Sequence, residues 1–475
     1  MYIELLTDSQ LEQLRDGVLH TLESVGMVFQ NERILNALSR MGASIDYANE
    51  TAKFPRRLVE AFIEDCQRQV AHATARKPKR FEPPPLPFMG VQVAQFYFDY
   101  ECKERRAGRR QDFITMIHFA DALEPGRAVG HCLLMSDIPH LIEPLEAVAL
   151  LIEHAHKPGY TYPHYIEQFD YLADIGEIYC GDRNRFLIGG IFITSPLRVC
   201  KRAADFLVKK IDLGLPCGVG TMPVMGASAP VTYAGAIVVA SAEIIGTWMA
   251  IRALNEGAEL NAGIGAGSID MRTGNATFCS PEAMLYNFAT VEFFRKVTGK
   301  KINVAGGSDY TDARMPGLYA AFEKATKAMM VACFTGRHPG AGQGMLESGK
   351  TLSPEQLLLD REMTEMVRLF AEPIEVNAET LALDAIEQVG IGLHSSYLES
   401  EHTLKWHRSA LWQPRFLDRS VWEGFERERA KEEAAVERAH ATFKETLTRY
   451  QPPQVDERML RDIHSVIERA RRNLL

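Results

Sequence analysis

Several signals that identify common protein classes are missing from this sequence of 475 residues. The two cysteines closest in sequence, Cys200 and Cys217, are 17 residues apart, so none of the eight cysteines forms a CxxC zinc or redox pair. The metalloprotease motif HExxH and the hydrolase motif GxSxG do not occur. The opening residues, MYIELLTDSQ, have neither the basic segment nor the apolar run of a signal peptide. Reduced thiols, no metal site and a cytoplasmic location are therefore expected.

Positive charge is also scarce. Lys and Arg number 53 against 62 Asp and Glu, which gives a net charge of −9 and no indication of a nucleic-acid surface. Hydrophobic residues make up 46%, enough for the core of a large enzyme. Residues 229–254 are apolar for longer than a bilayer requires, but they include Glu243 and Arg252. These charges favour a buried core helix, and no membrane association is expected.

The alternation of apolar runs and helical patterns indicates an α/β fold. Up to about residue 70 the spacing is helical without strands, and the proline-rich residues 82–87 form a linker. From about residue 110 the alternation is typical of a (β/α)8 barrel of the TIM type, although a doubly wound sheet fits the same pattern. The runs expected as strands are residues 128–135, 160–162, 186–194, 217–221, 260–264, 302–305, 340–346 and 389–393.

These patterns divide the chain into three regions. Residues 1–85 are expected to form an N-terminal helical lobe and linker, residues 86–420 the catalytic barrel, and residues 421–475 a C-terminal helical extension. The extension is rich in Glu, Arg and Lys over 425–450, and a last helix follows Pro452-Pro453. Its charges suit an exposed or subunit-contacting face, and a homo-oligomer is predicted.

The segment from Ile302 to Gly349 holds most of the side chains suited to binding. Its apolar start ends at Gly306-Gly307, polar residues follow, and helical spacing extends over 318–334. Because the loops after barrel strands carry the chemistry, this region is the favoured site. The sequence GMLESGKT at 344–351 matches a nucleotide-binding loop, but no strand precedes it and the next helix is expected to begin after Ser353. A phosphate-binding role is therefore not favoured.

Motifs along nearly the whole chain resemble one family. They are SPLR (195–198), GASAPVTYAGAIV (226–238), DMRTG (270–274), SPE (280–282), SDYTDARMPGLYAAFEKA (308–325), GAGQGMLESG (340–349) and HTLKWHRSALWQPRFLDR (402–419). In this order they are similar to the trimethylamine methyltransferase family. The resemblance implies a (β/α)8 barrel enzyme that moves a methyl group from a methylated amine to the cobalt of a separate corrinoid protein, in methanogenesis or acetogenesis.

The resemblance also bears on substrate and cofactor. Trimethylamine-specific members use pyrrolysine, proposed to bind the amine through its imine, whereas every residue here is an ordinary amino acid. A quaternary ammonium has no lone pair to add to an imine, so glycine betaine is the expected substrate, as in the family's glycine betaine:corrinoid protein methyltransferases. The alternatives are proline betaine, carnitine and trimethylamine. No DxHxxG corrinoid motif is present, so the corrinoid (cobalamin) is expected on the partner protein, with no cofactor on this chain.

A betaine offers a cationic nitrogen, which aromatic faces and carboxylates bind, and a carboxylate, which Arg or His binds. The side chains expected to bind the substrate are Tyr97, Tyr162, Asp309, Arg314, His338, Glu347 and His394. Arg314 and the two histidines are the candidates for the carboxylate, and the tyrosines and Glu347 for the ammonium. No catalytic residue is predicted, because demethylation of a quaternary nitrogen needs positioning and no general base.

Each assignment has a structural alternative. Arg314 could form a salt bridge with Asp309 or Asp312, and the aromatic run around Tyr97 could be a half-buried strand. The histidines, Tyr162 and Glu347 could be ordinary core or loop residues. For the whole chain, the alternative is a barrel enzyme of unrelated chemistry, such as an aldolase or decarboxylase, or a binding protein with this fold. An aldolase needs a lysine at a strand end, and the sequence shows none there.

Overall fold

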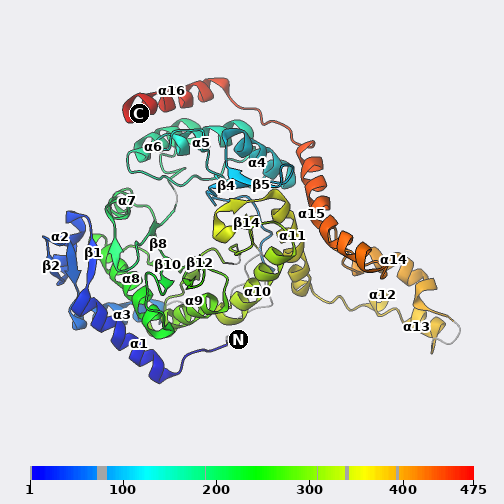
Figure 1. The fold of residues 1–475 in the computed structure, drawn as a ribbon, viewed down its shortest axis with the longest axis horizontal. Helices are drawn as coiled ribbons and strands as arrows, with labels where there is room; N and C mark the ends of the chain where they lie inside the picture. The colour runs from blue at the N-terminus through cyan, green and yellow to red at the C-terminus, as the bar shows by residue number, and fades with distance from the viewer. Residues whose placement is uncertain (1–2, 72–82, 188, 308, 337–341, 392–394) are drawn as a thin grey trace.

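The computed structural model describes residues 3–71, 83–187, 189–307, 309–336, 342–391 and 395–475. Its helices and strands form a mixed α/β body with a ring-like outline, from which a separate arm extends (Figure 1). The strands are β1 (Met27–Phe29), β2 (Ser44–Asp46), β3 (Thr51–Lys53), β4 (Phe96–Asp99), β5 (Glu104–Ala107), β6 (Ile191–Phe192), β7 (Arg198–Val199), β8 (Gly218–Thr221), β9 (Val224–Met225), β10 (Asn261–Ile264), β11 (Gly267–Asp270), β12 (Asn275–Thr277), β13 (Asn303–Val304), β14 (Met345–Leu346) and β15 (Thr351–Leu352).

Helices make up most of the regular structure. They are α1 (Asp8–His20), α2 (Glu32–Met41), α3 (Arg56–Ala71), α4 (Arg110–Leu123), α5 (Glu143–His154), α6 (Gln168–Cys180), α7 (Lys201–Asp212), α8 (Tyr233–Leu254), α9 (Pro281–Phe293), α10 (Leu318–Thr335), α11 (Pro354–Arg368), α12 (Ala378–Leu381), α13 (Leu383–Val389), α14 (Glu401–Ala410), α15 (Phe425–Leu447) and α16 (Glu457–Leu474). The helix predicted over 318–334 is confirmed as α10, and Ser353 caps α11 by accepting a hydrogen bond from the backbone N–H of Gln356.

Parallel pairing connects the central strands in chain order. One sheet contains β6, β8, β10 and β13, and every neighbouring pair in it is parallel. Single parallel bridges continue this order towards the N-terminus, joining Leu187 to Thr161, Pro158 to Val129, and Leu133 to Ala94. β4 then pairs in parallel with β15. The strands predicted at 217–221, 260–264 and 302–305 are confirmed by β8, β10 and β13.

Two strand predictions are wrong. The apolar residues from Val389 were expected to begin a buried strand, but Val389 ends helix α13 and Ile391 is 89% exposed. Ile391 therefore lies on the surface, and Val389, at 9% exposed, is buried at the end of a helix and not in a sheet. The first 70 residues were expected to lack strands, but β1, β2 and β3 form a small sheet there, and β1 pairs in parallel with β7. Each of these strands has only three residues, too few for a period of two to be visible.

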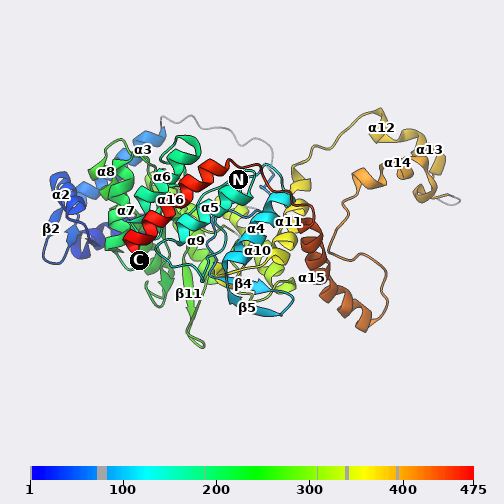
Figure 2. The ribbon, with the colours of Figure 1, turned by 90° about the horizontal axis from the view of Figure 1, so that it is seen from above.

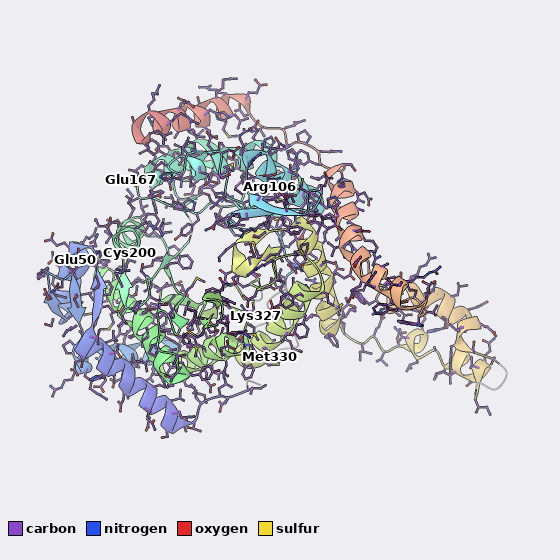
Figure 3. The ribbon with its side chains drawn as sticks, in the orientation of Figure 1. Glu50, Arg106, Glu167, Cys200, Lys327 and Met330 are labelled. Carbon is purple, nitrogen blue, oxygen red and sulfur yellow. The ribbon has the colours of Figure 1, made fainter. Side chains whose placement is uncertain are left out.

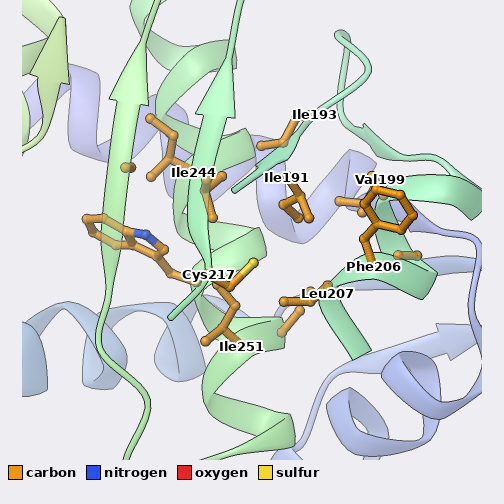
Figure 4. Packing of buried hydrophobic residues seen from close by; sticks show 14 of the residues in the cluster. Ile191, Ile193, Val199, Phe206, Leu207, Cys217, Ile244 and Ile251 are labelled. Atoms are coloured by element: carbon orange, nitrogen blue, oxygen red, sulfur yellow. The ribbon is translucent and has the colours of Figure 1, made fainter. Parts of the chain in front are cut away.

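Helix α8 forms the centre of the largest apolar cluster. Among the described residues it is the one helix long and apolar enough to cross a membrane, and 78% of its apolar window is buried inside the protein. Figure 4 shows Ile244 and Ile251 of α8 beside Cys217 and Leu207. The expected core helix is confirmed. Its buried Glu243 accepts hydrogen bonds from Ser195 Oγ (2.9 Å) and the Leu197 N–H (2.8 Å).

The C-terminal helices cover the outside of the ring. α15 packs on α4 and α11, and α16 packs on α5 and α6 (Figure 1). The two helices predicted on either side of Pro452-Pro453 are therefore confirmed. Residues 372–391 and 395–424 are called the arm below. They include α12, α13 and α14, and these three helices project away from the body in both views (Figure 2).

Candidate functional site

The loop that follows β13 places a carboxyl group in a cavity. Gly306 and Gly307 adopt positive φ angles of 69° and 43°, which turn the chain sharply after the strand. The Asp309 N–H donates to the Gly306 carbonyl, and Gln343 Nε2 donates to Asp309 Oδ2 at 2.8 Å. The cavity beside them has a volume of about 410 Å³. Its other walls come from Pro85 to Gly90 and from Arg127-Ala128.

Burial controls the ionisation of Asp309. Desolvation raises the pKa of its carboxyl to about 7, while the positive charge of Lys324 and the Gln343 hydrogen bond act in the opposite direction. A carboxyl that titrates near neutral pH and lines a cavity is a candidate for a functional role. At slightly alkaline pH it is mostly an anion, which can bind a cation.

A buried ion pair lies behind this carboxyl. Lys324 Nζ is 2.7 Å from Asp360 Oδ2, and both side chains are fully buried. Asp360 also accepts hydrogen bonds from Gln356 Nε2 and from the Gly344 N–H, each at 2.7 Å. A Cβ at Gly342 would lie 2.4 Å from Asp360 Oδ2, so only glycine fits there. The pair and the glycine-rich segment therefore form one rigid support.

Helix α10 supplies two lysines to the interior. Lys324 and Lys327 follow Ala320 and precede Val331 on its buried stripe. Figure 3 shows Lys327 on the side of α10 that faces the ring. Its Nζ donates to the Phe278 carbonyl at 3.1 Å and lies 5.4 Å from the centre of the Tyr310 ring. The inner face of α10 is thus positively charged next to the Asp309 loop.

A second, larger cleft of about 1660 Å³ opens beside the same loop. Arg314 and Glu347 both line it. Arg314 is exposed and makes no ion pair or hydrogen bond within the described part of the chain, so the expected alternative of a bridge to Asp309 or Asp312 is not found there. Asp312 instead accepts a hydrogen bond from Ser348 Oγ at 3.0 Å.

Glu347 is held in the turn between β14 and β15. Its φ of 50° lies in the left-handed region, and its N–H donates to the Ala313 carbonyl. The carboxylate accepts hydrogen bonds from Thr351 Oγ1 (2.6 Å) and Arg105 Nη1 (2.9 Å). Burial opposes ionisation, but these two bonds outweigh it and lower the pKa of Glu347. The GMLESGKT segment is therefore a strand–turn–strand unit, and the nucleotide-loop reading is excluded as expected.

Comparison with known proteins decides the family. The family model for trimethylamine methyltransferase (MTTB) matches residues 1–474. The chain belongs to this family. Trimethylamine methyltransferase MttB of Desulfitobacterium hafniense is 25% identical over 97% of this chain and 93% of the relative. The trimethylamine methyltransferase MttB2 of Methanosarcina mazei is 31% identical over 64% of this chain and 61% of the relative.

Two further likenesses are more distant. A glycine betaine methyltransferase of Desulfitobacterium hafniense is 23% identical over 95% of this chain and 94% of the relative. The crystal structure of the Methanosarcina barkeri monomethylamine methyltransferase aligns over 93% of this chain and 88% of that chain, with 14% identity and a TM-score of 0.47. The resemblance read from the sequence motifs is confirmed, and this family member is a methyl-transferring enzyme.

The residues expected to bind substrate in this methyltransferase do not form one group. Asp309 lines the smaller cavity, whereas Arg314 and Glu347 line the larger cleft. Tyr97 is only 8% exposed and belongs to the apolar cluster under α4 and α15, with Arg106 5.1 Å from its ring centre. The aromatic run around it is the half-buried strand β4.

The other expected residues lie elsewhere. Tyr162 donates its hydroxyl hydrogen to the Gly190 carbonyl at 3.1 Å, and its ring packs near Phe192 and His164. Burial raises the pKa of Tyr162. His338 and His394 lie outside the described residues.

The residues that hold the Asp309 loop in place were not identified from the sequence. Gln343 lies in residues 340–346, which were expected to form a strand, whereas the strand there, β14, covers only Met345–Leu346. Asp360 lies in a helix for which only the cap was predicted. Lys324 carried a usable signal, because it occupies a buried-stripe position of α10 where an apolar residue is the rule. A lysine at such a position needs a buried hydrogen-bond acceptor, and for Lys324 that acceptor is the Asp360 carboxylate.

A second polar cluster lies near Tyr162. His131 is fully buried between Thr161 Oγ1 (2.9 Å) and Glu143 Oε1 (3.0 Å). Glu143 Oε2 and His164 Nε2 are 3.9 Å apart, and burial lowers the pKa of His164. Among the described residues no group of three His, Cys, Asp or Glu side chains is placed to hold a metal ion. The contacts of His131 make this cluster a hydrogen-bonded network in the core.

Proposed function

We propose that this enzyme moves a methyl group from a quaternary amine, with glycine betaine the first candidate, to the Co(I) of a corrinoid carried by a separate protein. The family supports the type of reaction. The observation that carries the choice of a cationic substrate is the Asp309 carboxyl, which lines a cavity, titrates near neutral pH and is held by Gln343. A carboxylate in such a cavity attracts a quaternary ammonium by its charge, without a hydrogen bond, and so orients it.

The proposed reaction needs little from the protein beyond positioning. The C–N bond breaks with its electron pair going to nitrogen, a new bond forms between the methyl carbon and cobalt, and Co(I) becomes methyl-Co(III). The amine leaves neutral, so no proton has to move. Asp309 then acts by holding the substrate in line with the cobalt and not as a base. The buried Lys324 is paired with Asp360, the opposite of what a nucleophilic amine of an aldolase requires.

The parallel pairing suggests how the site is built. We infer that the segments at 94–97, 129–133, 158–161, 187–192, β8, β10, β13 and β15 close into a (β/α)8 barrel, since each pairs in parallel with its neighbour wherever a pairing occurs. Asp309 then follows the carboxyl end of one strand, as in barrel enzymes generally. The corrinoid protein would approach over the same end. A cytoplasmic, homo-oligomeric enzyme completes the proposal, and the eight cysteines are all free thiols.

Methyl transfer can be followed directly. Purified enzyme is mixed with Co(I) corrinoid protein, and the absorbance change to methyl-Co(III) is recorded as glycine betaine, proline betaine, carnitine, choline and trimethylamine are supplied one at a time. Turnover with glycine betaine and none with trimethylamine is expected. Turnover with trimethylamine alone would contradict the quaternary-amine assignment, and no turnover with any methylated amine would contradict the proposed function.

Arg314→Ala tests whether the substrate carboxylate is held in the larger cleft, which Arg314 lines, and not only in the smaller cavity beside Asp309. The exposed guanidinium faces the cleft without an ion pair, so its loss should reduce kcat/KM for glycine betaine about tenfold, the lower end for a charge-assisted contact. Choline, which has no carboxylate, should react as before. Arg272→Ala is the matched control, since Arg272 lines the same cleft but is paired with Asp270. An equal loss of kcat/KM for glycine betaine and choline would show that Arg314 has a structural role. A change only in the KM for the corrinoid protein would show that Arg314 binds that protein instead.

A further inference from the structure

The arm exposes an unusual amount of apolar surface. The fully or largely exposed side chains along it include Ile374 (92%), Ile391 (89%), Leu398 (87%), Val421 (80%), Leu404 (74%) and Leu411 (63%). Single exposed apolar residues are common, but a contiguous apolar surface larger than a few hundred Å² marks an interaction site. In both views the arm stands clear of the body (Figures 1 and 2).

The helices of the arm are too short to be stable alone. α12 has 4 residues, α13 has 7 and α14 has 10, whereas isolated helices below about 12–15 residues are marginal in water. Within the described residues, α14 packs on the turn Tyr397–Glu399, which is itself part of the arm. The structure of the arm therefore requires a surface that covers it.

Both ends of the arm are fixed to the body. Glu362 of α11 accepts hydrogen bonds from the backbone N–H groups of Arg415 (3.0 Å) and Phe416 (2.9 Å), where the chain returns. At the departing end, Arg368 Nη1 donates to the Pro84 carbonyl at 2.9 Å. The arm is thus held to the body where it leaves and returns, which we call its root, and it exposes apolar side chains beyond that point. Such an arm is suited to bind another molecule.

An apolar groove, called the root groove below, lies where the arm joins the body. It has a volume of about 730 Å³ and runs between α10, α11 and α15. Leu318, Met363, Met366, Trp422 and Phe425 line it, and Leu318, Trp422 and Phe425 are 66%, 72% and 68% exposed. The groove includes Phe416, Leu417 and Trp422, where the arm returns to the body, so exposed apolar residues occur both on the arm and at its root.

We propose that the arm packs into the root groove of a second copy of this chain. A two-fold interface uses the same surface on both copies, so the arm and its receptor must lie next to each other on one chain. That is the arrangement of the arm and the root groove. The exposed area supports such an interface. Phe370, Trp422 and Phe425 are 80%, 72% and 68% exposed. At roughly 150–250 Å² per fully buried ring, they supply about half of the roughly 800 Å² per partner of a stable interface, and the exposed aliphatic residues of the arm add to this.

The first test is the mass of the full chain in solution. The wild-type protein should have at least twice the mass of the 53.2 kDa chain by light scattering. The variant Ile374→Glu/Leu398→Glu/Leu404→Glu should have the mass of one chain, because these residues touch no core of their own. A matched control, Val25→Glu/Tyr47→Glu/Val231→Glu, changes exposed apolar residues outside the arm and should keep the wild-type mass. A monomeric wild type, or an arm variant of wild-type mass, would overturn the proposal.

The second test locates the contact. Leu404→Cys in one copy and Met366→Cys in another are mixed and oxidised, so that a disulfide between the two variants requires the arm of one chain in the root groove of the other. The pair Leu404→Cys and Val25→Cys controls for random coupling, including that of the exposed Cys102 and Cys180. The first pair alone should form covalent dimers. If instead the arm amides gain protection from hydrogen exchange only when the corrinoid protein is added, that protein is the occupant and the second-copy proposal fails.

Discussion

Replacing Lys324 by methionine should lower the free energy of unfolding by about 3–5 kcal/mol, because the buried Asp360 carboxylate is left without its counter-ion. Both side chains are fully buried and 2.7 Å apart, so solvent cannot take over the role of the ammonium. The loss is measured from urea unfolding curves of wild type and variant at pH 8. Lys327→Met is the matched control. It removes a buried lysine whose partner is the neutral Phe278 carbonyl, and about 1–3 kcal/mol is expected.

The pH dependence of the Lys324→Met variant identifies the cause. Burial already raises the pKa of Asp360 in the wild type, and removal of Lys324 takes away the attraction that opposes this shift. An acid with a higher pKa in the folded than in the unfolded state binds more protons when folded, so the variant should gain stability as the pH falls. The variant Lys324→Met/Asp360→Leu should recover most of the loss, as apolar replacements of buried ion pairs do. If the free energy of unfolding is lowered by the same amount at all pH values, the cause is lost packing and not the lost charge of Lys324.

Changing Asp309 to asparagine should reduce kcat/KM for glycine betaine about 10- to 100-fold, because the substrate cation loses a counter-charge whose attraction is at most about 4 kcal/mol at an effective dielectric constant of about 20. In the wild type, kcat/KM should rise as the pH passes upward through about 7, because only the ionised carboxylate attracts the ammonium. A quaternary substrate has no proton to lose, so this rise belongs to the enzyme. The asparagine variant should lack it.

Asp312→Asn is the control for the Asp309 experiment. Asp312 lies in the same loop but is bonded to Ser348, so its loss should leave the pH profile unchanged. Because the charge of Lys324 lowers the pKa of Asp309, Lys324→Met should also move the rise to higher pH wherever the variant is folded. A flat wild-type profile, or a rise that persists in Asp309→Asn, would remove Asp309 from substrate binding.

Local signals in the sequence were sufficient to predict where many helices and strands lie. The boundaries of α10 follow from its apolar spacing and Gly336, and the start of α11 follows from Ser353 and Pro354. The prediction of a strand beginning at Val389 was wrong for a physical reason. Apolar residues show that a surface must be covered, but not whether the cover comes from the same chain. The strands of the first lobe were missed because each has only three residues, and because one partner of β1, the strand β7, is remote in sequence.

The candidate site could be predicted only in part. Asp309 was chosen because polar residues follow a strand, and the structure places it in a cavity. Its support comes from Gln343 and Asp360, which reach the loop only through tertiary folding. Tyr97 had the right chemistry, but its position on β4 turns the ring into the core under α15. Residue type therefore indicated what could bind, while burial and pairing determine which side chains are available.

The position of α16 determines when the body can be completed during synthesis. Arg471 Nη2 donates to Glu146 of α5 at 3.1 Å, and Asn473 Nδ2 donates to the Tyr171 hydroxyl of α6 at 3.0 Å. At ribosomal rates of about 5–20 residues per second, roughly 15–60 seconds pass between the synthesis of α6 and that of α16. During that interval the outer faces of α5 and α6 are uncovered on a nascent chain. Helix α16 is thus the element whose loss, by early termination or proteolysis, would expose those helices to chaperones.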